Sequence, residues 1–467
     1  MVFNYDKTDK WSILEYSKQL LGKTLEEAVY PDVIDPKRGK GQLGQLVEVY
    51  FFGIENNSRQ EADFPKAGLE LKVTPLKRLK NNKLAIKERL VCTMIDFTEV
   101  QSVPFEESHV YLKCHYMLIP FYLHKDNVPV QQLKFIYDVL WQIPDKDLLI
   151  IKQDYEKIIA KIREGRAHEI SEGDTTYLGA CRKGQKGDKD AEYYLPDGKK
   201  AAISAPKRAF ALKPCYMRTV LEFAIRTGGQ GTYNTSALVH GYKQHLIEES
   251  ELRDKSFEDI LLERFEPFYG KSYEEIKEEI AKPGSKAKSK WFLVTNEILT
   301  LGETRGKDVL KSEEFLKSGI VIKTVRLTKT GRPKEAMSFE NIKYGEVMAE
   351  EDWYESRLYE LFTQRFLFVV FQEDNEKVTR LKKAFFWTMP AEDLSAAEQY
   401  WDNIRQSIRD NHISSEYFYK ESDHKMFHVR PKATKQYPIT DNPHGGKVKK
   451  LCYWFNHAYV KDIVNKG

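Results

Sequence analysis

An internal repeat constrains this fold most, because segments of the first half recur in the same order about 250 residues later. The four matching pairs are Gly22–Glu27 with Gly270–Glu275, Gly68–Lys72 with Gly319–Lys323, Lys87–Val91 with Lys334–Ser338, and the surroundings of Lys183 with those of Lys432. A repeat of this length is a whole domain, whereas solenoid units are much shorter. The 467 residues therefore predict two tandem domains built on one plan.

The boundary between the two copies is expected between residues 228 and 256. A helical run from Tyr216 to Ile225 stops at Gly228 and Gly229, and a polar and then charged stretch follows. We therefore expect a first domain over residues 1–230, a linker over 231–256 and a second domain over 257–467.

Composition excludes several classes of protein. A hydrophobic content of 41% with 12% aromatic residues supports packed cores, not disorder. The net charge of +4 is too small for a polycation, so composition alone does not indicate a nucleic-acid partner. Five cysteines without paired spacing indicate reduced thiols and a cytoplasmic location. No run approaches the roughly 20 apolar residues of a membrane span, so no membrane partner is expected.

The first copy carries two acids and a lysine at a spacing that suits metal-dependent phosphodiester hydrolysis: Asp63, Glu70 and Lys72. Residues 68–72 alternate between apolar and charged, which predicts a half-buried strand with Glu70 and Lys72 on one face. Asp63 is expected to join them from a loop or a neighbouring strand end. Mg²⁺ binds one or two carboxylates and keeps several waters, so Asp63 and Glu70 are the predicted ligands. The lysine has three open roles: orienting the attacking water, deprotonating it, or holding the phosphate.

The residues around this motif carry a family resemblance. Upstream, a helical pattern runs from Lys40 to Glu48 with glycines at 41 and 44. These glycines and Glu48, followed by Asp63-Phe64 and then residues 68–72, closely resemble the MutH family of PD-(D/E)xK nucleases, including type II restriction endonucleases with two MutH-like halves. The resemblance implies a mixed α/β fold in which each half is a central mixed sheet flanked by helices. It also places Glu48, Asp63, Glu70 and Lys72 at catalytic positions, with Glu48 as the auxiliary acid.

The second copy has lost one of the two acids of this motif. Val321 stands where the first copy has Glu70, and Glu314 aligns with Asp63. Because valine cannot bind Mg²⁺, the second copy is expected not to cut, and Lys323 remains as a relic or as a phosphate contact. The alternative is a misalignment by two residues, but no nearby shift places an acid two residues before Lys323.

The resemblance also implies DNA-reading positions. Residues 430–433 match the family's recognition motif Arg-Pro-Lys-Ala, and a lysine or arginine there can donate to guanine in the major groove. In the first copy only Lys183 matches, with Arg182 in the place of the proline. The DNA-contacting residues expected are Arg182, Lys183, Lys213, Arg430 and Lys432. Expected phosphate contacts are Lys77, Arg78, Lys80, Lys83, Lys87 and Arg89, and Lys113 is expected on a strand near the site. The aromatic cluster Tyr453–Phe455 and Tyr459 is interpreted as core.

Together, the motifs and the resemblance predict a Mg²⁺-dependent type II restriction endonuclease that cuts double-stranded DNA at GATC and leaves 5′-phosphate ends. The first half would cut, and the second would be a DNA-binding copy. With one cutting centre for two strands, we expect that two molecules associate transiently on DNA, or that one molecule is activated allosterically when its second half binds a second site. A cognate DNA methyltransferase would be the functional partner. The alternatives are a MutH-like repair nuclease that nicks one strand and a DNA-binding regulator without chemistry.

Overall fold

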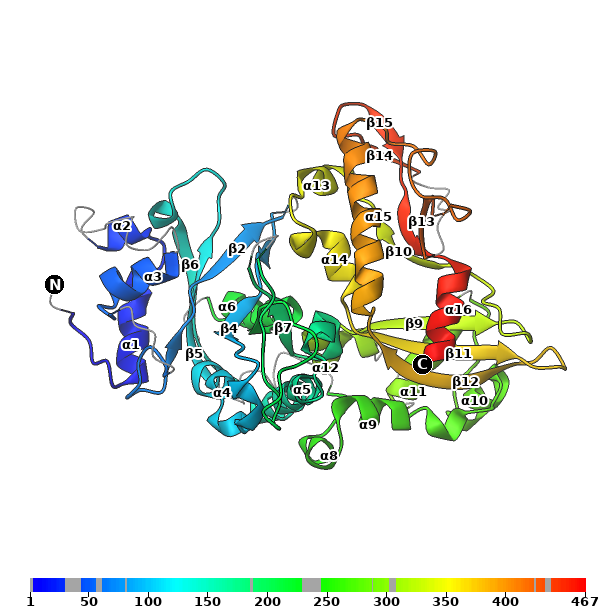
Figure 1. The fold of residues 1–467 in the computed structure, drawn as a ribbon, viewed down its shortest axis with the longest axis horizontal. Helices are drawn as coiled ribbons and strands as arrows, with labels where there is room; N and C mark the ends of the chain where they lie inside the picture. Colours follow the sequence, from blue (N-terminus) through cyan, green and yellow to red (C-terminus); the bar gives the residue numbers. More distant parts are fainter. Residues whose placement is uncertain are drawn as a thin grey trace. The chain divides into compact units, whose positions relative to one another are not determined.

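The computed structural model describes residues 3–29, 43–55, 61–79, 82–184, 188–228, 245–287, 289–301, 308–423, 426–432 and 438–467. It divides into two compact units, shown in Figure 1 and described separately below. Unit 1 consists of Met1–Ile170, Thr175–Asp254 and Leu310–Gly319, and unit 2 of Ser171–Asp174, Lys255–Val309 and Ile320–Gly467. Gly41, Lys80, Ala433 and residues 231–244 of the expected linker lie outside the described residues.

Unit 1 is built around β5, whose neighbouring strands run in different directions. The strands β1 and β2 pair with β5 in parallel, β6 pairs with it antiparallel, and β3 extends the sheet from β2. A second, antiparallel sheet has the order β4-β8-β7. The strands are β1 (Glu70–Leu71), β2 (Thr74–Arg78), β3 (Leu84–Ile86), β4 (Leu90–Met94), β5 (Tyr116–Leu123), β6 (Lys134–Gln142), β7 (Leu178–Arg182) and β8 (Arg208–Leu212).

The helices of unit 1 flank these sheets. They are α1 (Lys10–Ser17), α2 (Leu25–Ala28), α3 (Leu43–Leu46), the π-helix η4 (Val47–Phe51), α4 (His109–Cys114), α5 (Asp145–Arg163), α6 (Pro214–Arg226), α8 (Glu249–Asp254) and α12 (Glu313–Ser318). Buried Leu43, Leu46 and Val47 pack with Leu69 and Leu71 in one apolar cluster. This packing holds the α3–η4 helix against the strand that carries Glu70, as the helical pattern predicted.

Unit 2 repeats the same topology. The strand β11 pairs in parallel with β9 and antiparallel with β12, and a separate antiparallel sheet has the order β10-β16-β13. The strands are β9 (Val321–Leu327), β10 (Met337–Asn341), β11 (Phe366–Glu373), β12 (Thr379–Trp387), β13 (Phe427–Arg430), β14 (Ile439–Asp441), β15 (Lys447–Lys449) and β16 (Cys452–Phe455). The helices are α9 (Phe257–Glu263), α10 (Tyr273–Glu279), α11 (Lys290–Leu299), α13 (Tyr344–Ala349), α14 (Arg357–Phe362), α15 (Ala391–Arg409) and α16 (His457–Lys466).

Local signals recur in both copies. Thr24 and Ser272 each form a capping box with the glutamate three residues later, as expected for helix starts. The helices α5 and α15 both have 19 residues and both follow a proline. The order β4-β8-β7 corresponds to β10-β16-β13. The predicted mixed α/β fold, with sheets flanked by helices in each copy, is therefore confirmed.

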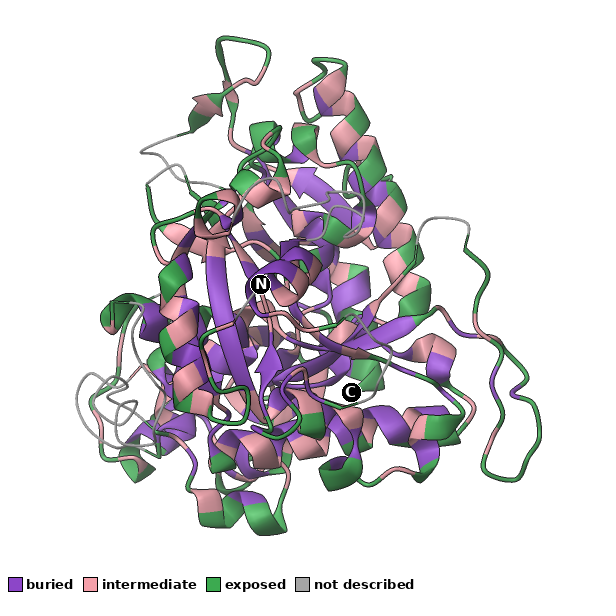
Figure 2. Ribbon diagram, turned by 90° about the vertical axis from the view of Figure 1, so that its left-hand side faces the viewer, coloured by how far each residue is buried: buried purple, intermediate pink, exposed green. Residues whose placement is uncertain are grey.

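Burial follows the layers of the fold. Figure 2 shows mostly buried strands beneath helices whose outer faces are exposed. Tyr453, Phe455 and Tyr459 are buried in the unit 2 core, which confirms the interpretation as core for these three residues, whereas Trp454 is only partly buried. The five cysteines are free thiols, as predicted. In the part of the chain that the structure describes, no helix is long and apolar enough to cross a membrane.

Candidate active site

The acids and the lysine of the first copy come together through a tight turn. Phe64 and Leu69 form an antiparallel bridge, and the turn between them contains Gly68 at φ +59°. A left-handed backbone of this kind favours glycine because no Cβ crowds the carbonyl. The turn returns the chain, so Asp63 lies beside the strand that begins at Glu70.

Asp63 and Glu70 hold each other in place through the backbone. The Leu71 N–H donates to Asp63 Oδ2 at 2.9 Å, and the Asp63 N–H donates to Glu70 Oε2 at 3.3 Å. Both carboxylates are thereby oriented before any ligand binds. This arrangement matches the prediction that Asp63 joins Glu70 from a loop.

Two lysines face the Glu70 carboxylate. Lys72 Nζ lies 2.7 Å and Lys113 Nζ 3.6 Å from Glu70 Oε1, so Glu70 and Lys72 share one face as period two requires. Lys72 also donates to the Cys92 carbonyl at 3.4 Å. Burial disfavours the Lys72 ammonium, but the attraction of Glu70 outweighs this effect, and the pKa of Lys72 is raised overall.

Two expectations for this region need correction. Residues 68–72 were expected to form a half-buried strand, but β1 covers only Glu70–Leu71, and Glu70, on the charged face, is only 2% exposed. Lys113 was expected on a strand but lies in the last turn of α4. Its ammonium reaches Glu70 because α4 immediately precedes β5, which pairs with β1.

Glu48 lies in the π-helix η4 and faces the same cluster. Burial raises the pKa of Glu48 to about 7, and the negative charges of Asp63 and Glu70 add to the shift. Burial likewise raises the pKa of Asp63 to about 6, with Glu70 contributing repulsion. Three carboxylates therefore crowd into a partly desolvated space that favours added positive charge.

This crowding fits a divalent cation. Among the described residues, no group of three or more His, Cys, Asp or Glu side chains is close enough to cage a metal ion. Mg²⁺ needs no such cage, because it is usually held by one or two carboxylates and retains several waters. Asp63 and Glu70 are placed to supply these two carboxylates, with Glu48 as a third acid nearby.

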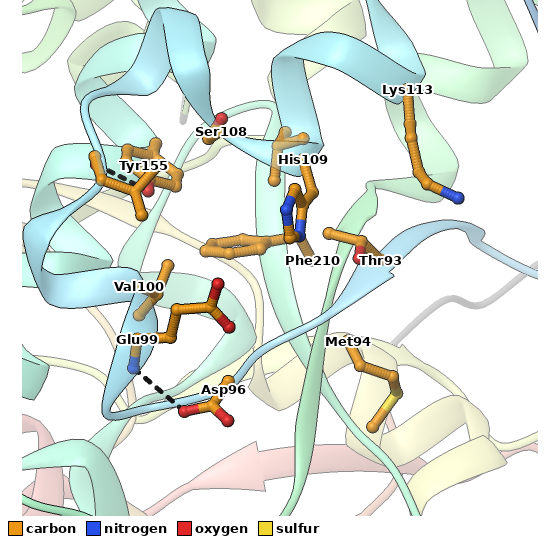
Figure 3. Close-up of a pocket in the computed structure, with 12 residues that line it drawn as sticks. Thr93, Met94, Asp96, Glu99, Val100, Ser108, His109, Lys113, Tyr155 and Phe210 are labelled. Carbon is orange, nitrogen blue, oxygen red and sulfur yellow. Dashed lines mark hydrogen bonds between the residues drawn. The ribbon is translucent and has the colours of Figure 1, made fainter. Parts of the chain in front are cut away.

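A pocket of about 340 Å³ adjoins the site through Lys113. Its wall comes from β4, β8, α4 and α5, including Thr93, Phe210, His109 and Tyr155. Figure 3 shows Lys113 at one end of the pocket, with its ammonium directed away from Tyr155. The sequence contained no signal for this pocket, because its wall combines elements far apart in the chain.

The expected DNA-contacting residues of the first half have different surroundings. Arg182 ends β7 and Lys183 follows it, and both are partly exposed. Lys213, at the start of α6, donates from Nζ to the Thr175 carbonyl. Burial raises the pKa of Asp154 to about 6, and the positive charge of Lys213 partly opposes this shift. Lys213 therefore has partners inside unit 1.

The expected phosphate contacts of the first half lie mainly on the β2–β3 hairpin. Lys77, Arg78 and Lys83 are exposed, and Arg78 donates to the Asn82 carbonyl at 3.2 Å. Lys87, just after β3, is paired with Glu88 at 2.8 Å. The hairpin thus presents a basic surface within unit 1.

In the second copy, Val321 opens β9 and Lys323 follows on the same face. Glu314, the sequence counterpart of Asp63, lies in helix α12 of unit 1 instead of in a turn before a strand. Its carboxylate is 2.5 Å from Lys146 and accepts from the Leu246 and Ile247 N–H groups. Glu314 and Asp63 therefore differ in local structure, and Glu314 already has partners in unit 1.

Arg430 and Lys432 lie at and just beyond the end of β13. The Arg430 guanidinium stacks on Trp454, 4.1 Å from the ring centroid, and lies 3.4 Å from Glu421. Lys432 is exposed and donates to the Phe339 carbonyl at 3.4 Å. Both side chains are thus positioned on the surface of unit 2.

Paired acids and a lysine on one face of a mixed sheet are the arrangement of a nuclease with a restriction-endonuclease-like fold. The family model of the DNA mismatch repair enzyme MutH matches residues 52–154, which contain Asp63, Glu70, Lys72 and Lys113. The chain is 32% identical to the type II restriction enzyme Sau3AI of Staphylococcus aureus, over 97% of this chain and 98% of that protein.

MutH proteins match only part of the chain. The similarity to DNA mismatch repair protein MutH of Shewanella woodyi is 30% identity over 42% of this chain and 82% of that protein. MutH of Vibrio vulnificus is 27% identical over 46% of this chain and 93% of that protein. The chain belongs to the family of MutH-like type II restriction enzymes, so the predicted fold and enzyme class, a site-specific deoxyribonuclease, are confirmed.

Proposed function

We propose that this enzyme cuts both strands of DNA at GATC with a single Mg²⁺-dependent centre in its first half. The observation that carries the proposal is the contrast between the Asp63–Glu70–Lys72 cluster and its copy, where Val321 replaces the buried acid. The proposal is also supported by membership of the family of MutH-like type II restriction enzymes and by the crowding of carboxylates in the first site.

The residues of the first site divide the chemistry among them. Asp63 and Glu70 would hold Mg²⁺, which supplies charge neutralisation and a more acidic water. Glu48, with a pKa near neutrality, would accept hydrogen bonds or a proton at the edge of the site. Lys72, held charged by Glu70, would orient the phosphate or the water, since an ammonium with a raised pKa is a poor general base. The products would carry 5′-phosphate and 3′-hydroxyl ends.

Recognition would come from loops at matching places of the two copies. The Arg-Pro-Lys-Ala motif at 430–433 supports GATC as the sequence read, through the resemblance to the MutH family. Arg430 and Lys432 would contact DNA in the second half, and Arg182 and Lys183 in the first. Lys213 stays a predicted DNA contact, although its ammonium also donates to the Thr175 carbonyl.

The proposed domain roles follow from these assignments. Residues 1–230 would form the cutting domain, 231–256 the linker and 257–467 a DNA-binding copy without chemistry. Because one centre cannot cut two antiparallel strands in one docking, two chains would meet transiently on DNA. A cognate methyltransferase would protect host DNA, and the enzyme would work in the cytoplasm.

A plasmid digest tests the proposal. With Mg²⁺, unmethylated plasmid should yield discrete fragments whose sequenced ends lie at GATC and carry 5′-phosphates. Nicked circles alone would support a repair nuclease, and uncut plasmid with retained binding would support a regulator. Fragments ending at another sequence would overturn the proposed specificity but not the proposed site.

A further inference from the structure

Lys323 occupies the position of the catalytic lysine in the second copy, yet its surroundings lack an acid. Its Nζ donates to the Ser338 carbonyl at 3.0 Å and lies 4.1 Å from the centroid of the Phe339 ring. Among the residues that the structure describes, no carboxylate lies within ion-pairing distance of Lys323. The ammonium is therefore held by a carbonyl and a ring face alone, both weaker partners than an anion.

The second copy lacks a counterpart of Glu70, and it also lacks a counterpart of Lys113, the second lysine that faces Glu70 in the first copy. Helix α14 corresponds to α4, since both have six residues and both are capped by a serine, Ser356 and Ser108. Counted from these caps, the position of Lys113 is taken by Leu361, which is buried in the unit 2 core. An ion pair around Glu70 is thus replaced by two apolar residues, Val321 and Leu361, and only Lys323 remains charged.

A second cation approaches the same place. Lys432 donates to the Phe339 carbonyl, the residue next to the partner of Lys323. Burial, together with the nearby positive charge of Lys432, lowers the pKa of Lys323 to about 8. Two like charges brought together without an anion are unfavourable, so an anion bound between them would relieve the repulsion.

The geometry also leaves room for a ligand. A pocket of about 250 Å³ is lined by β9 and β10, including Lys323, Thr324 and Ser338. The acid on its wall, Glu335, is exposed and paired with Arg326. Lys432 is not among the residues that line this pocket, but it reaches β10 beside the pocket through the Phe339 carbonyl.

We propose that the second copy grips one DNA phosphodiester between Lys323 and Lys432 without a metal ion. Val321 makes this possible, because a glutamate there would pair with Lys323 as Glu70 pairs with Lys72. The inference rests on the proposed DNA-binding role of the second half. It assigns to this degraded site a binding chemistry different from that of the first.

The test uses the full chain carrying Asp63→Asn, so that DNA is bound but not cut. Affinity for a GATC duplex is measured in EDTA across a range of salt concentrations. Lys323→Met should weaken binding roughly tenfold and reduce the salt slope by about 1, as expected when one charged contact to a phosphate is lost. Lys343→Met, which removes an exposed lysine paired with Glu346, is the matched control and should change neither.

Val321→Glu is the sharper variant because it leaves both lysines in place. It should weaken binding in EDTA and make binding dependent on added Mg²⁺ or Ca²⁺, since the new carboxylate withdraws Lys323 from the phosphate. Thermal unfolding of each variant identifies any loss of folding. Unchanged EDTA affinity in folded Lys323→Met and Val321→Glu proteins overturns the inference.

Two further measurements separate the possible failures. If Arg430→Ala weakens specific binding but Lys323→Met does not, the second half binds DNA and only the phosphate grip is wrong. If none of the variants affects binding, the DNA-binding role itself is wrong.

Labelling of Lys323 by reductive methylation should be blocked by duplex DNA. Equal protection by millimolar inorganic phosphate alone would show a free-anion site instead, which also overturns the inference.

Discussion

The strands β1 and β9 begin at corresponding places in the two copies but carry different chemistry. Each follows a glycine in the left-handed conformation, Gly68 or Gly319, and each presents a lysine two residues after its first position. On β1 the lysine faces a buried glutamate held by two cations, whereas on β9 it faces a valine. The fold tolerates both because the β5 and β11 cores beneath are apolar in each case.

The comparison shows that the counterparts of Glu70 and Lys113 are both apolar in the second copy. Glu70 buried without Lys72 and Lys113 would be an uncompensated charge, and an isolated lysine in the place of Lys113 would face no acid. Replacement of Glu70 by valine therefore goes with replacement of Lys113 by leucine. Lys323 is the exception, and this exception is what motivates a binding role for it.

The largest expected effect concerns Asp63, one of the two predicted Mg²⁺ ligands. Asp63→Asn keeps an oxygen to accept from the Leu71 N–H but removes the charge that would hold Mg²⁺. Single-turnover cleavage should fall by roughly a thousandfold or more, about 4 kcal/mol in activation free energy. Glu106→Gln, at an exposed pair with Lys152, serves as control. A normal rate in Asp63→Asn would mean that the cutting centre lies elsewhere.

The two glycines provide a second comparison. Gly319→Ala places a Cβ 2.5 Å from Cys215 Sγ in addition to a strained φ, so it should destabilise unit 1 by about 2–3 kcal/mol. Gly68→Ala meets no atom within 4 Å, so only the strain of about 1–2 kcal/mol applies. Denaturant unfolding measures both costs. Equal costs would show that the contact with Cys215 relaxes freely.

Lys113→Leu introduces into the first copy the residue of the second. Glu70 would keep Lys72 but lose its weaker partner at 3.6 Å, so we expect cleavage to slow by about tenfold. Lys113→Arg should restore most of the rate because it keeps the charge. If the leucine variant cuts as fast as the parent, Lys113 does not help to hold Glu70.

The smallest effect is a pH dependence that only the first site should show. The pKa values of Glu48 and Asp63, about 7 and 6, lie above the ordinary values of these side chains. At a pH between the ordinary and the raised values, the folded state therefore binds more protons than the unfolded state. In EDTA, stability should therefore fall as the pH rises from about 4 to 7. Mg²⁺ should restore it at the upper end by binding the ionised carboxylates. Thermal unfolding of the parent and of Asp63→Asn checks this, and identical pH profiles would contradict it.

Much of the site could be predicted from the sequence, because its geometry is local. The period of two places Glu70 and Lys72 on one face, and the turn at Gly68 brings in Asp63 a few residues away. Lys113 was assigned to the wrong element because its approach to Glu70 depends on the packing of α4 beside β5. The pocket at Lys113 had no local signal for the same reason.

The extent of unit 1 depends on contacts that no local pattern reveals. Helix α12 lies in the second repeat of the sequence but belongs to unit 1, where buried Lys317 pairs with Asp147 at 2.6 Å and with Glu313. The partners Lys317 and Asp147 are 170 residues apart in the chain. The sequence predicted the repeat, but it could not show that part of the second repeat, helix α12, belongs to unit 1.

The most direct test of a single cutting centre follows strand breaks on a plasmid with one GATC site. At low enzyme concentration the account predicts that nicked circles accumulate first, and that conversion to linear DNA accelerates with enzyme concentration or with a second site. Direct formation of linear DNA, at a rate per enzyme independent of concentration and of a second site, would show that one chain cuts both strands and would contradict the account.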